Sequence, residues 1–188
     1  MAEILLFHHA QGLTPGVVAF ADDLRAAGHT VHTPDFYDGR RFETVEEGVD
    51  HARSLGFGAV VDRAAGAADG LPDDLVYAGF SLGVMPAQRL AQTRPGARAA
   101  VLIDAAVPAE EFGGWPDGLR AQIHGMDADP WFGDEDRAAA QGLAEIDGVE
   151  LFLYPGDAHL FADSSLPAHD EVAAALLRQR VLEFLADL

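Results

Sequence analysis

Cysteine and lysine are both absent from this chain of 188 residues. Without cysteine, the protein has no disulfide, no thiolate ligand for zinc and no thiol nucleophile. Without lysine, it cannot form a Schiff base with a carbonyl substrate or with pyridoxal phosphate. Apolar runs of membrane-spanning length are absent too, and the N-terminus lacks the basic and apolar regions of a signal peptide. We therefore expect a cytoplasmic protein without a membrane anchor.

Positive charge is scarce as well. The sequence holds 31 aspartate and glutamate residues against 12 basic residues, all of them arginine, which gives a formal net charge of −19. Such a surface repels the phosphates of nucleic acids and the anionic headgroups of lipids, so neither is an expected partner. The chain has no low-complexity tract, and its length suits a single domain over residues 1–188.

Short apolar segments alternate with helical patterns along the chain. Strands are expected at residues 4–7, 30–33, 75–80, 99–104, 119–124 and 149–154. The alternation predicts an α/β fold with about six mainly parallel strands and helices on both faces of the sheet. Only about fourteen residues separate the fourth strand from the fifth, which leaves no room for a separate lid domain.

The segment Gly79-Phe80-Ser81-Leu82-Gly83 lies between an expected strand and an expected helix. In this context the Gly-x-Ser-x-Gly pattern is typical of a nucleophile elbow, a sharp turn that raises a serine hydroxyl above the edge of a sheet. The two glycines allow the strand and the helix to approach each other. The alternative is an ordinary serine turn that caps the following helix.

A nucleophilic serine needs a base, and the base needs an acidic partner. In elbow-type hydrolases the acid follows the serine along the chain, and the histidine follows the acid. Here Asp127 and Asp129 follow the fifth expected strand, and His159 follows the sixth. Because the carboxyl ends of parallel strands meet at one edge of a sheet, we expect Ser81, His159 and one of these aspartates to converge.

The chain resembles the dienelactone hydrolase family of the α/β-hydrolase superfamily. The similarity covers nearly the whole chain and lies in the first-strand loop ending at Gly12 and in residues 34–37, 79–83, 129–132 and 156–161. It implies an α/β-hydrolase fold and a cofactor-free enzyme that cleaves a small carboxylic ester, lactone or thioester. By the same resemblance, Ser81 is the nucleophile, His159 the base and Asp129 the acid, with Asp127 as the alternative acid.

Several features depart from the family pattern. Many members carry a cysteine nucleophile where this chain has Ser81, and a glutamate common in the first-strand loop is matched by His9. Asp163 stands where the dienelactone enzymes have an arginine for the substrate carboxylate, and Arg40 matches a second such arginine only after a shift of one residue. Dienelactone itself is therefore not an expected substrate. The chain also begins at what would be the third strand of the full fold, as in a reduced form of it.

The positions of other residues in the loops after the expected strands predict further parts of the site. Backbone N–H groups of Leu82 and Ala10 are expected to form the oxyanion hole. The expected substrate-binding side chains, most of them aromatic, are His9, Phe36, Tyr37 and Trp131. For His9, structural hydrogen bonding and metal ligation are alternatives. No metal site is expected, because adjacent His8 and His9 point to opposite sides of an extended segment and no pair has a recurrent ligand spacing.

Two main classes of function remain open on the sequence, besides a metal-dependent hydrolase that would lose activity with a chelator. One is the serine hydrolase, which acts on a small molecule either by hydrolysis or by acyl transfer. The other is a non-catalytic ligand-binding or sensing protein that keeps the hydrolase scaffold. The closing helix carries an apolar stripe that suits packing on its own sheet, and the protein is expected to be a monomer or a homodimer.

Overall fold

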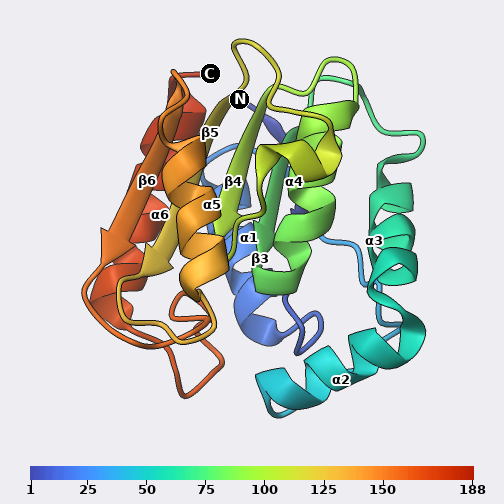
Figure 1. The fold of residues 1–188 in the computed structure, drawn as a ribbon, viewed down its shortest axis with the longest axis vertical. Coiled ribbons are helices and arrows are strands. Elements are labelled where there is room, and N and C mark those ends of the chain that lie inside the picture. Colours follow the sequence, from blue (N-terminus) through green and yellow to red (C-terminus); the bar gives the residue numbers. More distant parts are fainter.

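Six parallel strands form one sheet in the computed structural model, which describes residues 1–188 (Figure 1). The strands are β1 (Glu3–Phe7), β2 (Thr30–His32), β3 (Val76–Phe80), β4 (Ala99–Ile103), β5 (Arg120–Met126) and β6 (Val149–Tyr154). They lie in the order β2-β1-β3-β4-β5-β6, and every neighbouring pair is parallel. The predicted α/β architecture is thereby confirmed. The carboxyl ends of the strands gather at the lower edge in Figure 1, opposite both chain termini.

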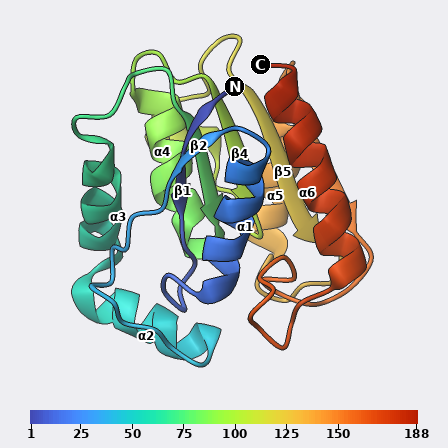
Figure 2. The same cartoon turned by 180° about the vertical axis from the view of Figure 1, so that it is seen from behind.

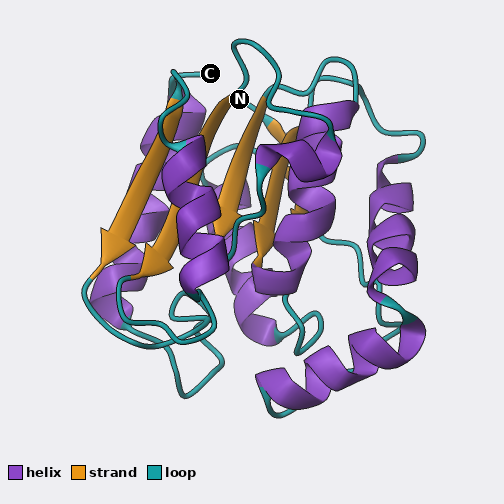
Figure 3. Ribbon diagram, in the orientation of Figure 1, coloured by secondary structure: helices purple, strands orange, loops and turns teal.

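Helices cover both faces of the sheet (Figure 3). The α-helices are α1 (Pro15–Ala26), α2 (Val45–Leu55), α3 (Phe57–Ala65), α4 (Val84–Thr93), α5 (Asp134–Leu143) and α6 (Glu171–Ala186), and the 3₁₀ turns are η1 (Gly66–Ala68), η2 (Ser81–Gly83) and η3 (Ala109–Phe112). Helices α1 and α6 lie on one face (Figure 2), whereas α4 and α5 lie on the other, with α3 beside α4. No helix is both long enough and apolar enough to cross a membrane.

Two hydrophobic cores result from this layering, one on each face of the sheet. In β1, Leu5 and Phe7 belong to the core beneath α4 and α5, whereas Ile4 and Leu6 belong to the core beneath α1 and α6. A strand that is buried on both faces requires apolar residues at successive positions rather than at alternate ones. This explains why the sequence shows continuous apolar runs at the central strands.

Local signals set the limits of the helices. Thr14 and Thr44 cap α1 and α2, each through a side-chain oxygen that accepts a backbone N–H of the first turn. Gly56, with a φ of 85°, separates α2 from α3. Helix α3 then begins at Phe57 and includes Gly58.

The fifth strand is longer than the sequence pattern indicates. It continues past His124 to Met126, because both residues pair with residues of β6. Asp127 therefore follows directly after the strand. The connection from β4 to β5 contains only the short turn η3, in line with the expectation that the chain has no separate lid domain.

Candidate active site

Ser81 occupies a sharp turn between β3 and α4. Its φ is 48°, a left-handed conformation that costs a non-glycine residue about 1 kcal/mol or more. Both flanking glycines are required by close backbone approaches. A Cβ on Gly79 would lie 2.1 Å from the Gly83 carbonyl oxygen, and a Cβ on Gly83 would lie 2.5 Å from the carbonyl oxygen of His8. The turn thus has the geometry expected of a nucleophile elbow.

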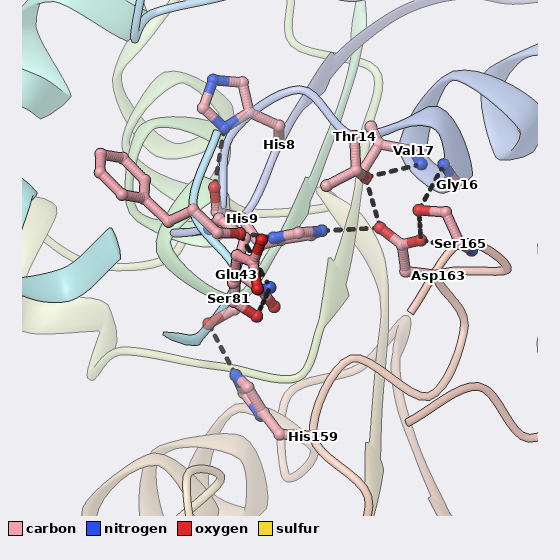
Figure 4. A network of polar contacts seen from close by, with 12 residues as sticks. His8, His9, Thr14, Gly16, Val17, Glu43, Ser81, His159, Asp163 and Ser165 are labelled. Carbon is pink, nitrogen blue, oxygen red and sulfur yellow. Dashed lines mark hydrogen bonds and ion pairs between the residues drawn. The ribbon is translucent and has the colours of Figure 1, made fainter. Parts of the chain in front are cut away.

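His159 lies between Ser81 and Asp129. Its Nε2 is 2.9 Å from the Ser81 Oγ (Figure 4), and its Nδ1 is 2.7 Å from Oδ2 of Asp129. Since a carboxylate only accepts hydrogen bonds, Nδ1 carries the ring proton and donates a hydrogen bond to Asp129, which leaves Nε2 free to accept from the serine hydroxyl. The other oxygen of Asp129 accepts the backbone N–H of Trp131 at 2.8 Å. Asp129 and His159 are both buried, whereas Ser81 is partly exposed.

The structure separates the two aspartates that the sequence left as alternatives. The exposed Asp127 accepts the backbone N–H of Gly156 at 3.1 Å and forms no hydrogen bond with His159. Asp129 is buried and is the carboxylate hydrogen-bonded to the imidazole. Asp127 therefore stabilises the turn after β6, while Asp129 orients His159.

The loop after β1 lies against the elbow. The close approach of Gly83 to the carbonyl oxygens of Phe7 and His8 brings the loop beside the start of α4. The N–H of Ala10, in the same loop, has no hydrogen-bond acceptor in the protein. Leu82, the other residue expected to supply an N–H group, follows Ser81 in the first turn of the elbow.

The predicted substrate-binding side chains are not all placed at the serine. Trp131 is 40% exposed, and its ring centroid lies 5.9 Å from that of His159. Phe36 and Tyr37 are instead core residues, each only 2% exposed, because Phe36 stacks on the buried His8 and Tyr37 donates its hydroxyl to the Gly48 carbonyl. Neither offers surface to a ligand above Ser81.

His9 likewise belongs to a buried network rather than to a pocket wall. Its Nε2 is 2.8 Å from Oδ2 of Asp163, while its Nδ1 accepts the backbone N–H of Gln11 (Figure 4). Asp163 also accepts hydrogen bonds from Thr14 and Ser165. Burial opposes ionisation of Asp163, but these hydrogen bonds outweigh it and lower its pKa to about 2. The network links the loop after β1, the start of α1 and the loop after β6.

Asp104 is a further residue at this site, and sequence reasoning assigned it no role. It follows β4 with a φ of 62°, is 1% exposed, and has no hydrogen-bond partner for either carboxylate oxygen. Burial raises the pKa of Asp104 to about 7, with His159 and the backbone N–H of Leu160 opposing the rise and Asp129 adding to it. The available sequence signal was its position directly after a buried strand, on the edge where Ser81 and His159 were expected.

Asp104, Asp129 and His159 form the one group of three potential metal ligands in the protein, with donor atoms within 4.8 Å of one another. A cation at their centre would have to break the hydrogen bond that already joins His159 to Asp129. That bond also gives Nε2 the orientation it needs toward Ser81. The arrangement is therefore that of a hydrogen-bonded cluster beside a serine rather than that of a metal centre.

Comparison with known proteins gives matches among solved structures. No protein-family model and no curated protein sequence matches the chain. A dienelactone hydrolase from Anabaena variabilis superimposes with a TM-score of 0.72 at 21% identity, covering 100% of this chain and 86% of that one. A dienelactone hydrolase-like promiscuous phosphotriesterase from metagenomic libraries gives 0.71 at 16% identity, with 100% and 87% covered. Mouse alpha/beta hydrolase domain-containing protein 10 gives 0.70 at 14% identity, with 98% and 90% covered.

The chain has the α/β-hydrolase fold. The resemblance to dienelactone hydrolases that the sequence motifs indicated thus holds for the fold of the whole chain. In this fold the elbow after β3, the loop after β5 and the loop after β6 meet at one edge of the sheet, and these elements carry Ser81, Asp129 and His159.

Proposed function

We propose that the protein is a serine hydrolase of the dienelactone hydrolase family that cleaves a small carboxylic ester, lactone or thioester. The observation that carries this proposal is the continuous hydrogen-bond chain from Ser81 through His159 to Asp129, with distances of 2.9 and 2.7 Å. An imidazole that is oriented by a buried carboxylate and in contact with a serine hydroxyl on a strained elbow is the arrangement that activates serine.

The reaction starts with attack of the Ser81 oxygen on the substrate carbonyl carbon. The hydroxyl proton passes to Nε2 of His159, and Asp129 stabilises the resulting imidazolium. Backbone N–H groups of Leu82 and Ala10 would stabilise the negative charge on the carbonyl oxygen. The tetrahedral intermediate then expels the alcohol or thiol, which takes the proton from His159 and leaves an acyl-serine.

The second half of the reaction releases the acid. A water molecule gives a proton to His159 as its oxygen attacks the acyl carbon, and collapse of the intermediate returns that proton to Ser81. All groups required for both halves belong to the chain itself, so the proposed enzyme uses no cofactor. An alcohol or amine in place of water would give acyl transfer, and product analysis with an added alcohol distinguishes the two outcomes.

The surroundings of Ser81 favour small and uncharged or cationic substrates. Asp163, at the position of an arginine that binds the substrate carboxylate in dienelactone enzymes, is buried against His9 and offers no positive charge. The net charge of −19 further disfavours anionic substrates. Trp131 is the exposed aromatic side chain closest to His159, and it supplies an apolar surface for one end of the ester.

A fluorophosphonate probe with intact-mass detection tests the proposal. We expect a single adduct on the wild-type protein, no adduct on Ser81→Ala, and an unchanged adduct on Ser54→Ala, which removes an exposed serine far along the chain from the elbow. Wild-type protein that stays unlabelled would overturn the hydrolase proposal. That result would favour a ligand-binding or sensing protein built on the same scaffold.

A further inference from the structure

The carboxylate of Asp104 is enclosed without a partner. Its backbone N–H donates to the His124 carbonyl at 2.8 Å, so the main chain is satisfied at the end of β4. The side chain is 1% exposed, and neither oxygen accepts a hydrogen bond. Proteins rarely leave a buried polar group unpaired, because the loss of hydration costs roughly 1–3 kcal/mol or more.

The groups that face Asp104 come from the ends of the neighbouring strands. Tyr154 belongs to β6, His159 and the backbone N–H of Leu160 belong to the loop after it, and Asp129 belongs to the loop after β5. No arginine forms an ion pair with Asp104. The guanidinium of Arg180 lies 5.2 Å from the ring centroid of Tyr154.

One further carboxylate faces the imidazole from a helix. Asp136 of α5 accepts the backbone N–H of Ala106 at 3.2 Å; burial raises its pKa, and this hydrogen bond and the charge of His159 oppose the rise. Unlike Asp104, it already has a hydrogen-bond partner. His159 is therefore the only cationic group that can pair with Asp104 inside this cluster.

We propose that Asp104 is a positioning residue that supplies His159 with a second carboxylate partner, one that takes over from Asp129 when Asp129 is removed. Donor atoms of the three side chains lie within 4.8 Å of one another, so the carboxylate of Asp104 lies beside the imidazole that Asp129 orients. The inference rests on the proposed serine hydrolase, because it concerns the orientation of that enzyme's base.

Burial first, and then the charge of the neighbouring groups, determine the ionisation of Asp104. Two carboxylates this close to each other do not both ionise readily, and only Asp129 is hydrogen-bonded to His159. Asp104 therefore keeps its proton up to neutral pH in the resting protein, consistent with a pKa raised to about 7 by burial. Removal of Asp129 takes away this repulsion and leaves Asp104 as the acceptor for the imidazole.

The rate of fluorophosphonate labelling of Ser81 provides the test. For an enzyme with a single acid, loss of that acid costs roughly 10⁴-fold. We expect Asp129→Ala to lose only about 10²-fold, Asp104→Asn to lose about threefold, and the double variant to lose about 10⁴-fold or more. A double variant less than about tenfold slower than Asp129→Ala overturns the proposal.

Asp136→Asn provides the matched control, because it removes another carboxylate that faces His159 without removing a partner. Combined with Asp129→Ala, it should cause no loss beyond that of Asp129→Ala alone. If Asp136→Asn causes the same additional loss as Asp104→Asn, the effect comes from the total negative charge around His159 rather than from Asp104, and the proposal is overturned. Wild-type labelling is measured first, since its absence refutes the proposed hydrolase rather than the role of Asp104.

The pH dependence of labelling distinguishes positioning from a structural effect. In Asp129→Ala the reactive form requires both a neutral His159 and an ionised Asp104. The logarithm of the labelling rate should therefore rise with pH along a slope above about one on the acid side, and return to about one in the double variant. A slope of about one in both Asp129→Ala and the double variant would contradict the proposed role of Asp104. Asp129→Asn, which conserves side-chain volume, replaces Asp129→Ala if the alanine variant fails to fold.

Discussion

The protein contains two buried histidine–aspartate pairs that differ in what the second ring nitrogen contacts. His159 is 2.7 Å from Asp129, and His9 is 2.8 Å from Asp163. The Nε2 of His159 faces the hydroxyl of the partly exposed Ser81, whereas the Nδ1 of His9 is occupied by a backbone N–H. The pairing of imidazole and carboxylate is therefore not itself a sign of catalysis. What distinguishes the proposed catalytic pair is a free acceptor nitrogen directed at a nucleophile.

The carboxylates of the two pairs differ in the same way. Asp163 accepts hydrogen bonds from His9, Thr14 and Ser165, so its negative charge is compensated on several sides. Asp129 accepts from His159 and from one backbone N–H, and its neighbour Asp104 has no partner. A network in which every polar group has a hydrogen-bond partner stabilises the fold. A network with an unpaired carboxylate retains a group whose ionisation depends on the charges around it.

Substitution of His159 should give the largest effect. We expect His159→Ala to slow labelling of Ser81 by at least about 10⁴-fold, because the serine loses its base. The variant should also lose stability, because the buried Asp129 is left without its imidazole partner, so labelling is compared per folded molecule. Labelling rates and thermal melting of the same preparations check this. Labelling at a rate near that of the wild type would contradict the assignment of the His159–Asp129 pair to catalysis.

Asp163→Asn should show the opposite profile. An amide cannot accept all of the donors that converge on this carboxylate, and we expect a loss of about 4 kcal/mol in the free energy of unfolding. Labelling per folded molecule should change little. Urea denaturation near neutral pH measures the loss, with Asp157→Asn, an exposed acid in the same loop, as the control. A loss no larger than that of the control would remove Asp163 from the structural role.

The same pair gives a pH dependence. The pKa of Asp163 is lowered from 3.8 to about 2, so its ionised form stabilises the folded state above the unfolded pKa. That contribution, about 2 kcal/mol, is lost as the pH falls from 3.8 through about 2. The stability difference between wild type and Asp163→Asn should shrink over this interval.

Asp104→Asn should act on stability with the opposite sign. The pKa of Asp104 is raised from 3.8 to about 7, so ionisation favours the unfolded chain. This cost is absent below 3.8, grows as the pH rises to about 7 and is complete above it. We expect the variant to be more stable than the wild type by about 4 kcal/mol at slightly alkaline pH and by much less under acidic conditions. Melting curves across this range that run parallel for both proteins would contradict the expectation.

Asp127→Asn should give the smallest effect. Asp127 is exposed and contributes one hydrogen bond to Gly156, so we expect a loss of about 1 kcal/mol or less. The labelling rate of Ser81 should stay within about twofold of the wild-type rate, in contrast to Asp129→Ala. A tenfold or greater loss, about 1.4 kcal/mol in the barrier, would show that the two aspartates share the role of the acid.

Prediction from the sequence succeeds best where the chain is locally consistent. The six strands were recognisable because both faces of the sheet are covered, so apolar runs mark them directly. The elbow was recognisable from Gly79 and Gly83. Both glycines are required, because a Cβ at either position would lie less than 3 Å from backbone atoms. Strand order follows from neither signal, because pairing depends on contacts between distant segments.

Prediction was weakest for residues whose roles depend on packing. Phe36 and Tyr37 follow a strand on the functional edge, yet they turn into the core and pack with His8. Asp163 looked like a replaced substrate-binding residue, but it anchors a structural network. Position after a strand indicates which edge a residue occupies without indicating the direction of its side chain.

By itself, the sequence determined the alternation of strands and helices, the strained serine turn and the order of serine, acid and histidine along the chain. The tertiary structure decided which of Asp127 and Asp129 reaches His159, that His9 pairs with Asp163, and that Asp104 is enclosed without a partner. The physical reason is that helices, strands and turns depend on neighbours along the chain. Hydrogen-bond partners and burial at the site depend on segments up to 154 residues apart, which only folding brings together.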